Sequence, residues 1–290
     1  MTFLSSFWIW RQNVPGEVIE AITCKVTDAV LGARYAAPMT EFPSTLKTWR
    51  AARRMSQLQL AVEAEVSSRH ISFLETGRAR PSREMIGRLG DALQMPLDAR
   101  NQMLLTAGFA PRYPQRRWEA DEMAPIRDAV AHMLDTHAPY PGLAVDRLWS
   151  VLRMNAPARL LYGPLGLTEG GSMLDLLMSD HLPGHIENWP AVAHHAARRL
   201  RIESAAQGGV ARLDAVAEHL AQVPPPSDRS LAPVVPTILR AGKMRLVLFA
   251  TIAQFGTPED LLLDDLKVEL YFPADPESGA VLCALAQNGG

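Results

Sequence analysis

The sequence predicts two domains of different class: an all-α domain of five short helices, followed by an α+β domain with an antiparallel sheet. Between residues 44 and 112, apolar residues recur at helical spacing in short segments that capping residues separate. After residue 124, short apolar runs typical of strands flank a group of helical segments. The chain has 290 residues, 48% of them hydrophobic and 21% charged, so it is long enough for two such cores.

The first two helices are predicted from apolar spacing and from one cap. The residues whose spacing predicts the first helix are Leu46, Trp49 and Ala52. Ser56 stands where its hydroxyl can accept a hydrogen bond from a free backbone N–H, so a second helix is expected over residues 57–63. The residues expected to face the core are Leu58, Ala61 and Val62. Residues 64–66 are expected to form the turn after this helix.

A third helix is expected over residues 67–76, with Ser67 as its N-cap and Gly77 just beyond its end. Ile71 and Leu74 have the spacing of inward-facing residues. This phase leaves four polar side chains exposed near the start of the helix: Ser68, Arg69, His70 and Ser72. A helix that presents such side chains at its N-terminus can read base edges in the major groove of DNA.

A basic loop follows the third helix. Arg78 and Arg80 lie in this loop, where they can bind phosphate groups. Two further helices, over residues 82–93 and 98–107, complete the domain. The sequence therefore predicts a DNA-binding helix-turn-helix domain over residues 44–112.

Two motifs resemble a known family of DNA-binding proteins. The pattern S-Q-x-x-L-A at residues 56–61 and the pattern I-S-x-L-E-x-G at residues 71–77 resemble the lambda-repressor/Cro type of helix-turn-helix, the XRE family. The longer runs SSRHISFLETGRARPSREMIGRL and RNQMLLTAGFAPRY are similar to one subgroup, the MmyB-like regulators. The later segments HAPYPGLAVDRLW, IENWPAV, FGTPED and YFPAD resemble the ligand-binding domain of that subgroup, so the resemblance covers most of the chain from residue 44 onward.

The resemblance implies roles for particular residues of the first domain. Arg50 and Glu75 match positions that form a partly buried ion pair between the first and third helices, and Gln57 matches a position that hydrogen-bonds a phosphate. The residues expected to contact DNA are Gln57, Ser67, Ser68, Arg69, His70, Ser72, Arg78 and Arg80. Arg69 is the strongest candidate for a base contact, because arginine bidentate to guanine contributes about 1–3 kcal/mol of discrimination.

One residue departs from the family pattern, and a second is unusual for a recognition helix. Glu65 stands in the turn where the family has glycine, and a left-handed backbone there costs a non-glycine residue on the order of 1 kcal/mol. We expect lower stability from this change rather than loss of function. Phe73 is unusual on an exposed recognition helix. It is expected to pack on the body of the domain, and contact with a thymine methyl is the alternative.

Charge is divided unevenly between the two domains. Residues 44–112 carry eleven Lys or Arg and six Asp or Glu, which gives this segment a net charge of +5. The whole chain has a net charge of −2, so the remaining residues carry −7. Only the first domain is electrostatically suited to a phosphate backbone, and the acidic remainder argues against a second nucleic-acid surface.

Cysteine content and hydropathy limit the possible location of the protein. The two cysteines, Cys24 and Cys283, form neither a metal-binding pattern nor a disulfide framework, so a reducing cytoplasm is the expected location. The apolar run over residues 244–255 is shorter than the roughly 20 residues that cross a bilayer. We expect a buried strand there and no membrane partner.

The N-terminal residues 1–43 fit poorly with the rest of the chain and are expected to be a poorly ordered or non-native extension. The aromatic stretch over residues 3–10 has no basic segment before it, so a secretory signal is not expected. Met39 directly precedes the family-like region. One hypothesis is that translation starts at Met39, which a peptide from residues 14–25 in the native protein would contradict.

Residues 113–123 lack apolar periodicity and are expected to link the first domain to a second one over residues 124–285. Helices are expected over residues 124–136, 156–162 (capped by Asn155), 172–178, 188–205 and 211–222. Strands are expected over residues 142–145, 149–154, 234–240, 244–252 and 267–272. The MmyB-like resemblance implies that this domain has a PAS-like fold enclosing a small-molecule cavity.

Apolar side chains of the second domain could line such a cavity, and each could equally fill a core. The candidates are Met154, Leu160, Leu161, Met173, Leu174, Leu177, Trp189, Leu248 and Phe249, of which Met154, Leu161, Leu174, Trp189 and Phe249 are chosen as ligand-binding residues. The resemblance implies a fatty-acyl-like ligand. It also marks Asn188 with Trp189 and the segment FGTPED, where Thr257 or Asp260 could instead serve as an N-cap.

Metal-binding and catalytic interpretations find little support. Pro and Gly interrupt the spacing between His181 and His185, and the adjacent His194 and His195 point apart on a helix. The stretch Gly170, Gly171 and Ser172 does not form a nucleophile elbow, and no phosphate-binding glycine loop is present in the sequence. No catalytic residue, metal or cofactor is therefore expected.

Three functional hypotheses remain. The first is a transcription regulator that binds operator DNA as a homodimer and responds to a small hydrophobic effector. The second is an enzyme tethered to DNA, which would need a nucleophile and a base that the sequence does not reveal. The third is a DNA-binding antitoxin or assembly factor whose second domain binds a protein partner.

Overall fold

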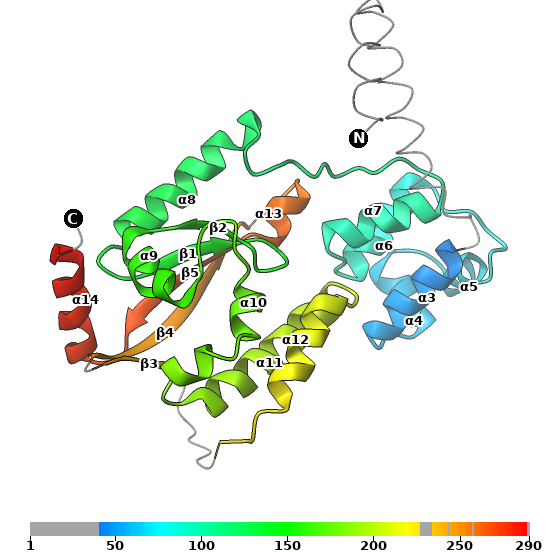
Figure 1. The fold of residues 1–290 in the computed structure, drawn as a ribbon. Helices are drawn as coiled ribbons and strands as arrows, with labels where there is room; N and C mark the ends of the chain where they lie inside the picture. Colours follow the sequence, from blue (N-terminus) through cyan, green and yellow to red (C-terminus); the bar gives the residue numbers. More distant parts are fainter. Residues whose placement is uncertain (1–40, 227–233, 243, 257, 289–290) are drawn as a thin grey trace, which may run out of the picture. The chain divides into compact units, whose positions relative to one another are not determined.

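The computed structural model describes residues 41–226, 234–242, 244–256 and 258–288 (Figure 1). These residues form two compact units, one of residues 41–93 with 101–111 and one of residues 94–100 with 112–288. The expectations for residues 1–40, including the start at Met39, lie outside the described residues.

Five helices make up the region predicted to bind DNA: α3 (Phe42–Ala52), α4 (Gln57–Glu63), α5 (Ser68–Glu75), α6 (Arg83–Ala92) and α7 (Leu97–Thr106). The predicted caps are confirmed. Ser56 and Ser67 accept hydrogen bonds from the backbone N–H groups of Gln59 and His70, and Ser82 caps α6 in the same way. Helix α3 begins before residue 44, because Phe42 is buried and belongs to the same core as Leu46 and Trp49.

The predicted buried face of α4 is wrong. Leu58 and Val62 are 64% and 67% exposed, whereas Leu60 and Ala61 are buried. Helix α4 has seven residues, and its apolar residues at positions 58, 60, 61 and 62 surround most of the helix. Periodicity cannot fix the phase of so short a helix, and packing against α5 selects the face with Leu60.

The second unit is an α+β domain. Its helices are α8 (Ala124–Thr136), α9 (Ala156–Tyr162), α10 (Met173–Leu177), α11 (Trp189–Ala206), α12 (Ala211–Ala221), α13 (Leu261–Asp265) and α14 (Pro276–Asn288). Its strands are β1 (Gly142–Val145), β2 (Val151–Met154), β3 (Thr237–Ala241), β4 (Met244–Gln254) and β5 (Lys267–Pro273). Short 3-10 turns lie at η1 (Asp121–Met123), η2 (Gly163–Leu165) and η3 (Leu182–His185).

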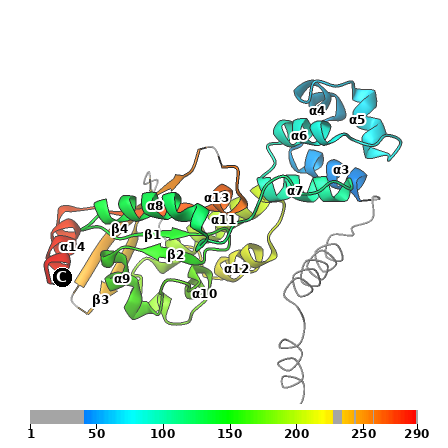
Figure 2. The same cartoon turned by 90° about the horizontal axis from the view of Figure 1, so that it is seen from above.

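The strands form one antiparallel sheet in the order β2-β1-β5-β4-β3, with helices on both faces. Side chains alternate across the sheet, so that Leu143 and Val145 of β1 join the core on one face and Ala144 joins the core on the other. Helices α9, α10 and α12 lie on the first face and α8 lies on the second (Figure 2). The predicted antiparallel α+β class is confirmed.

Asn155 ties the first hairpin to the helices around it. Its side-chain oxygen caps α9 at the Ala158 N–H and also accepts a hydrogen bond from the Gly142 N–H, while its amide nitrogen donates to the carbonyls of Leu134 and Tyr140. The residue is almost completely buried. The cap predicted from sequence is confirmed, and the three additional contacts make Asn155 a junction of α8, β1 and α9.

The predicted linker is fastened to the second unit. The carbonyl of Pro114 accepts a hydrogen bond from the Leu261 N–H, and Arg116 donates to Asp260 from its backbone and from its guanidinium at 3.2 and 3.0 Å. The other carboxylate oxygen of Asp260 caps α13 by accepting from the Leu262 N–H. Asp260 therefore has the predicted capping role, whereas Thr257 lies outside the described residues.

Two helices were not predicted, α13 and α14. The predicted third strand also begins too early, since β3 starts at Thr237 and not at residue 234. The remaining predicted elements of this domain agree with the structure to within two residues at each end.

Candidate functional site

The turn between α4 and α5 places the start of α5 on the surface. Glu65 has a φ of 54°, the left-handed conformation that was predicted for this position. Ser67 then ends the turn by capping α5, so its hydroxyl oxygen accepts from the His70 N–H at 3.2 Å. Because Ser67 has this structural contact, its predicted contact with DNA would have to share the same hydroxyl.

A buried ion pair holds α5 against α3. The Nε and Nη2 atoms of Arg50 donate to the two carboxylate oxygens of Glu75 at 2.6 and 3.0 Å, and Nη1 donates to the Met55 carbonyl at 2.8 Å. The Glu75 side chain is only 4% exposed. Burial raises the pKa of Glu75, but hydrogen bonds from Arg50 and Gln57 outweigh it and leave the pKa below its ordinary value. The predicted ion pair is confirmed.

Gln57 belongs to the same cluster. Its amide nitrogen donates to Glu75 Oε2 at 2.8 Å. An amide nitrogen carries two N–H donors, so one donor remains for the predicted phosphate contact. The contact with Glu75 fixes where that donor points.

The exposed face of α5 carries the predicted base-contacting residues. Ser68 and Arg69 are exposed, and His70 and Ser72 are partly buried. The guanidinium carbon of Arg69 lies 5.2 Å from the ring centroid of Phe73, one helical turn later. Phe73 is partly buried, so the ring supports the arginine on the surface instead of sitting wholly within the core.

Two more arginines follow at the end of α5. Gly77 has a φ of 71° and terminates the helix, as predicted. Arg78 and Arg80 are exposed in the loop beyond it. The surface formed by the start of α5 and this loop, here called the basic face, therefore presents three exposed arginines.

A large cavity of about 500 Å³ lies in the second unit, between the sheet and helices α10 and α11. Three of the predicted residues line it, namely Met173, Leu177 and Phe249. Its other apolar residues include Leu176, Leu182, Ile186, Val192 and Ile252. The volume is within the range of about 300–1,000 Å³ that is usual for small-molecule sites.

One wall of the large cavity carries a charge-balanced cluster that the sequence analysis missed. Arg199 donates to Glu203 at 2.9 Å and to Glu269 at 2.6 Å, and the Lys267 ammonium pairs with Glu203. The side chains of Lys267 and Glu269 are 7% and 3% exposed. Burial lowers the pKa of Arg199, but the two carboxylates outweigh this and raise it above its ordinary value.

Aromatic residues extend the cluster. The Trp149 indole N–H donates to Glu203 at 2.9 Å, and the Arg199 guanidinium lies 4.3 Å from the Trp149 ring centroid. The Tyr271 hydroxyl donates to Glu269 at 2.8 Å. Burial raises the pKa of both Tyr162 and Tyr271, so these two hydroxyl groups stay protonated and can act as donors.

A signal for this cluster was present in the sequence. Lys267 and Glu269 alternate along a strand that is otherwise apolar, which places both charges on one face of the sheet. Arg199 and Glu203 are four residues apart on one helix, a spacing that favours ion pairs. Pairing these two patterns requires knowledge that α11 lies over β5.

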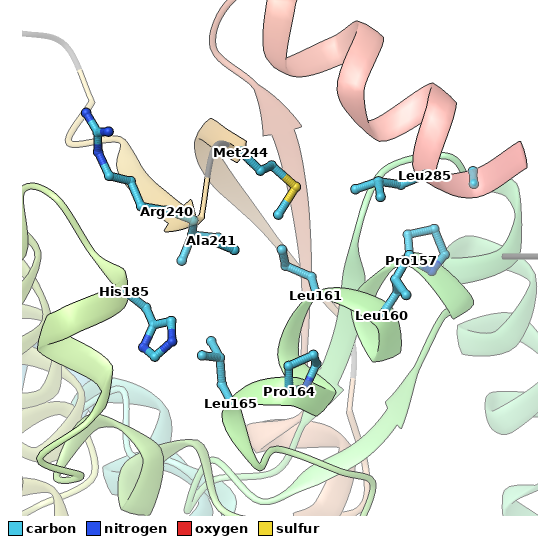
Figure 3. A pocket seen from close by; sticks show the side chains of 12 residues that line it. Pro157, Leu160, Leu161, Pro164, Leu165, His185, Arg240, Ala241, Met244 and Leu285 are labelled. Carbon is cyan, nitrogen blue, oxygen red and sulfur yellow. The ribbon is translucent and has the colours of Figure 1, made fainter. Parts of the chain in front are cut away.

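A smaller cavity of about 250 Å³ lies beside α9, β3 and α14 (Figure 3). The predicted residues Leu160 and Leu161 line it, together with Pro157, Pro164, Met244 and Leu285. Leu165 and Leu239 line both this cavity and the large one. The two spaces are therefore neighbours.

The other predicted ligand-binding residues line neither cavity. Met154, Leu174 and Leu248 are almost fully buried in the core, and Trp189 packs against that core. Asn188 is an anchor for β3, since its side chain donates to the Pro236 carbonyl at 2.7 Å and accepts from the Ile238 N–H at 3.0 Å. Asn188, which the family-like motif marks, thus holds β3 in place at the edge of the large cavity and does not line the cavity itself.

Three of the four histidines considered as metal ligands, His181, His185 and His194, lie within hydrogen-bonding distance of backbone carbonyls. The Nε2 atoms of His181 and His194 lie 3.1 and 2.8 Å from the carbonyl oxygens of Leu165 and Val223. Within the described part of the chain, no three His, Cys, Asp or Glu side chains are grouped as a metal site. No helix in the same part is both long and apolar enough to span a membrane.

Two segments of the chain match known domain families. Residues 41–103 match a helix-turn-helix domain, and residues 126–285 match the MmyB-like transcription regulator ligand binding domain. No curated protein matches the chain. The second match covers more than half of the 290 residues. The chain therefore belongs to the MmyB-like transcription regulators, with a helix-turn-helix DNA-binding domain followed by the ligand-binding domain that defines the family.

Proposed function

We propose that the protein is a sequence-specific transcription regulator that binds operator DNA as a homodimer and releases or tightens its hold when a hydrophobic, fatty-acyl-like effector enters the large cavity. The observation that carries this proposal is the large cavity itself, a mainly apolar space of about 500 Å³ with one charged wall, in the domain that accompanies a DNA-binding domain. Ligand coupling of about 1–3 kcal/mol would change operator affinity by about 5- to 150-fold.

In the proposed complex, the basic face and the side chain of Gln57 supply two kinds of contact. Ser68 and Arg69 contact base edges, with the guanidinium of Arg69 oriented by Phe73. Arg78, Arg80 and the free N–H of Gln57 contact phosphates, which adds affinity without sequence information. His70 and Ser72 flank these contacts from the same helix.

The DNA part of the proposal is tested by selecting sites from random duplexes. A palindrome with half-sites roughly 34–36 Å apart would support both sequence preference and a two-fold dimer. Affinity should fall steeply between about 50 and 200 mM salt. Arg69→Ala should relax base preference at one position by about 1–3 kcal/mol, whereas Arg78→Ala, the matched control, should weaken all sequences evenly.

The effector part is tested on the full chain. Protein purified without added lipid is extracted and analysed by mass spectrometry, and operator affinity is compared before and after the extract is removed and restored. Ala196→Trp, which fills the large cavity from α11, should abolish the response while leaving operator binding in place. Equal operator affinity with and without lipid would contradict the effector role and favour a protein partner for the second domain.

The large cavity has a binding role in this function and not a catalytic one. Arg199 and Glu269, which line it, are paired with each other, and Glu203 and Lys267 behind them complete the cluster. An enzyme tethered to DNA would require an activated nucleophile beside a base. The Tyr271 hydroxyl beside Glu269 does not fit that role, because burial raises the pKa of Tyr271 and keeps its hydroxyl protonated.

A further inference from the structure

The small cavity has no role in the function proposed above. It is bordered by η2, η3 and the ends of β3 and α14, and its sides are mostly aliphatic (Figure 3). At about 250 Å³ it is smaller than the roughly 300–1,000 Å³ of an ordinary ligand site, so it is not suited to hold a complete effector by itself.

We infer that the small cavity is the far end of the effector site, and that it receives the terminal methylenes of a long, unbranched alkyl chain whose remainder fills the large cavity. This inference rests on the proposed function, because it requires that the large cavity binds an amphiphile. It adds a second subsite, and with it a dependence on chain length, to the fatty-acyl-like effector proposed above.

The position of the small cavity supports this assignment. Leu165 of η2 and Leu239 of β3 line both cavities, so these two side chains lie at the boundary between them. Leucine side chains move between staggered rotamers at low cost. Strand β3 lies at the edge of the sheet, where it pairs with β4 on one side and has only an isolated bridge, from Leu239 to Ile186, on the other. The boundary is therefore at the margin of the sheet and not in its centre. A chain could pass when the two side chains turn aside.

The chemistry of the small cavity favours an alkyl tail over a polar head. Its two polar neighbours already have partners: His185 Nδ1 lies 3.1 Å from the His181 carbonyl, and the Arg240 guanidinium pairs with Glu187. The large cavity, by contrast, contains Arg199, Glu269 and the Tyr271 hydroxyl. The polar group of an amphiphile therefore has hydrogen-bonding partners in the large cavity, and its tail has an apolar end in the small one.

This arrangement makes affinity depend on chain length in a defined way. Each methylene transferred from water into an apolar space raises affinity by about fourfold. Alkyl chains that end within the large cavity gain affinity only from contacts with the walls of that cavity. For longer chains, affinity continues to rise with length only if the small cavity is open to them. In a variant whose small cavity is filled, affinity should therefore stop rising beyond a defined chain length.

The test uses the full chain and straight-chain carboxylates from octanoate to stearate, with the matching alcohols to separate the effect of the head group. Affinities are measured by displacement of anilinonaphthalene sulfonate. Ala241→Phe places a ring in the small cavity, Ala196→Phe places one in the large cavity, and Ala205→Phe adds a ring to an exposed position of α11 that lines neither.

We expect Ala241→Phe to leave short chains within about twofold of the unsubstituted protein and to weaken the longest ones at least tenfold, since about two methylenes contribute that factor. Ala196→Phe should weaken every chain, and Ala205→Phe should weaken none. A length series for Ala241→Phe that runs parallel to that of the unsubstituted protein, whether equal or uniformly lower, would overturn the inference.

A second measurement does not depend on the folding of any variant. A long-chain carboxylate with a diazirine at its terminal carbon is cross-linked to the unsubstituted protein, and the labelled peptides are identified. Labelling at Leu160, Leu161 or Leu285 supports the inference, and labelling confined to residues of the large cavity overturns it. Failure of every chain to bind would instead overturn the effector proposal itself.

Discussion

The two domains hold their functional residues in opposite ways. In the helix-turn-helix domain, the basic face is built from one short stretch, from Ser67 to Arg80, so local spacing alone places its residues together. In the ligand-binding domain, the polar wall of the large cavity joins Trp149, Arg199 and Glu269, which come from separate elements. A DNA-binding surface built from one helix and the loop after it can be recognised from sequence. The lining of a cavity can be assigned only once the fold is known.

Removal of the ion pair that supports the basic face should have the largest effect on stability. Arg50→Ala should destabilise the helix-turn-helix domain by about 3–5 kcal/mol, because it leaves Glu75 buried without its cation. Denaturant unfolding, followed by amide exchange in α3 and α5, measures the loss. Glu63→Ala, at an exposed position of α4, is the control and should change stability by less than about 0.5 kcal/mol. Equal effects would mean that the pair is not structural.

The equivalent support in the ligand-binding domain is Asn155. Asn155→Ala should cost about 3 kcal/mol, since it removes the partners of four backbone groups, which lie in α8, in the loop before β1, in β1 and in α9. Ser172→Ala removes only the cap of α10 and should cost about 1 kcal/mol. If thermal unfolding shows the two variants to be equally stable, the junction is less important than its contacts suggest.

The two domains should also differ in their response to pH. Burial raises the pKa of Asp265 to about 6, and Arg147 only partly offsets it. This value is above the roughly 3.9 of an unfolded aspartate, so the contribution of Asp265 to stability is present at low pH and is lost as pH rises through about 6.

Asp265→Asn should therefore stabilise the ligand-binding domain at about pH 7, by on the order of 1 kcal/mol, and have less effect at about pH 5. Urea unfolding at both pH values measures the difference. Glu75 in the other domain has a lowered pKa, so its contribution has the opposite sign: it is present above the unfolded value and is lost as pH falls through the folded one. An effect of Asp265→Asn that does not depend on pH would contradict the assignment.

The smallest expected effect concerns the turn before α5. Glu65→Gly should stabilise the helix-turn-helix domain by up to about 1 kcal/mol, because glycine adopts the left-handed conformation at no steric cost. The matched control is Glu63→Gly at the last residue of α4, where the backbone is helical, so glycine has no steric advantage and should not stabilise the domain. Stability would be read from denaturation midpoints. A destabilising Glu65→Gly would show that the side chain contributes more than its backbone strain costs.

The sequence predicts most elements of both domains because capping residues are local signals. Ser56, Ser67, Ser82, Asn155 and Ser172 all begin helices where they were expected to. Helix α4 shows the limit of this reasoning. Its start was predicted correctly, but its buried face was not, because four apolar residues in seven positions are compatible with more than one phase.

The cavity residues were predicted less well, for a related reason. Met154 and Phe249 are both apolar and both lie on strands, yet one fills the core and the other borders the large cavity. Whether an apolar side chain faces a core or an empty space depends on the helices above the sheet. The charged residues of the cluster carried more information than the apolar ones, because buried charge needs a partner.

The arrangement around Trp149 gives the protein an optical reporter of its own. The indole borders the large cavity and lies against the charges of Arg199 and Lys267, whose centres are 4.3 and 5.6 Å from the ring. A compound that displaces water or shifts either cation must alter the electric field at that ring. Intrinsic fluorescence can therefore follow occupancy without an attached dye.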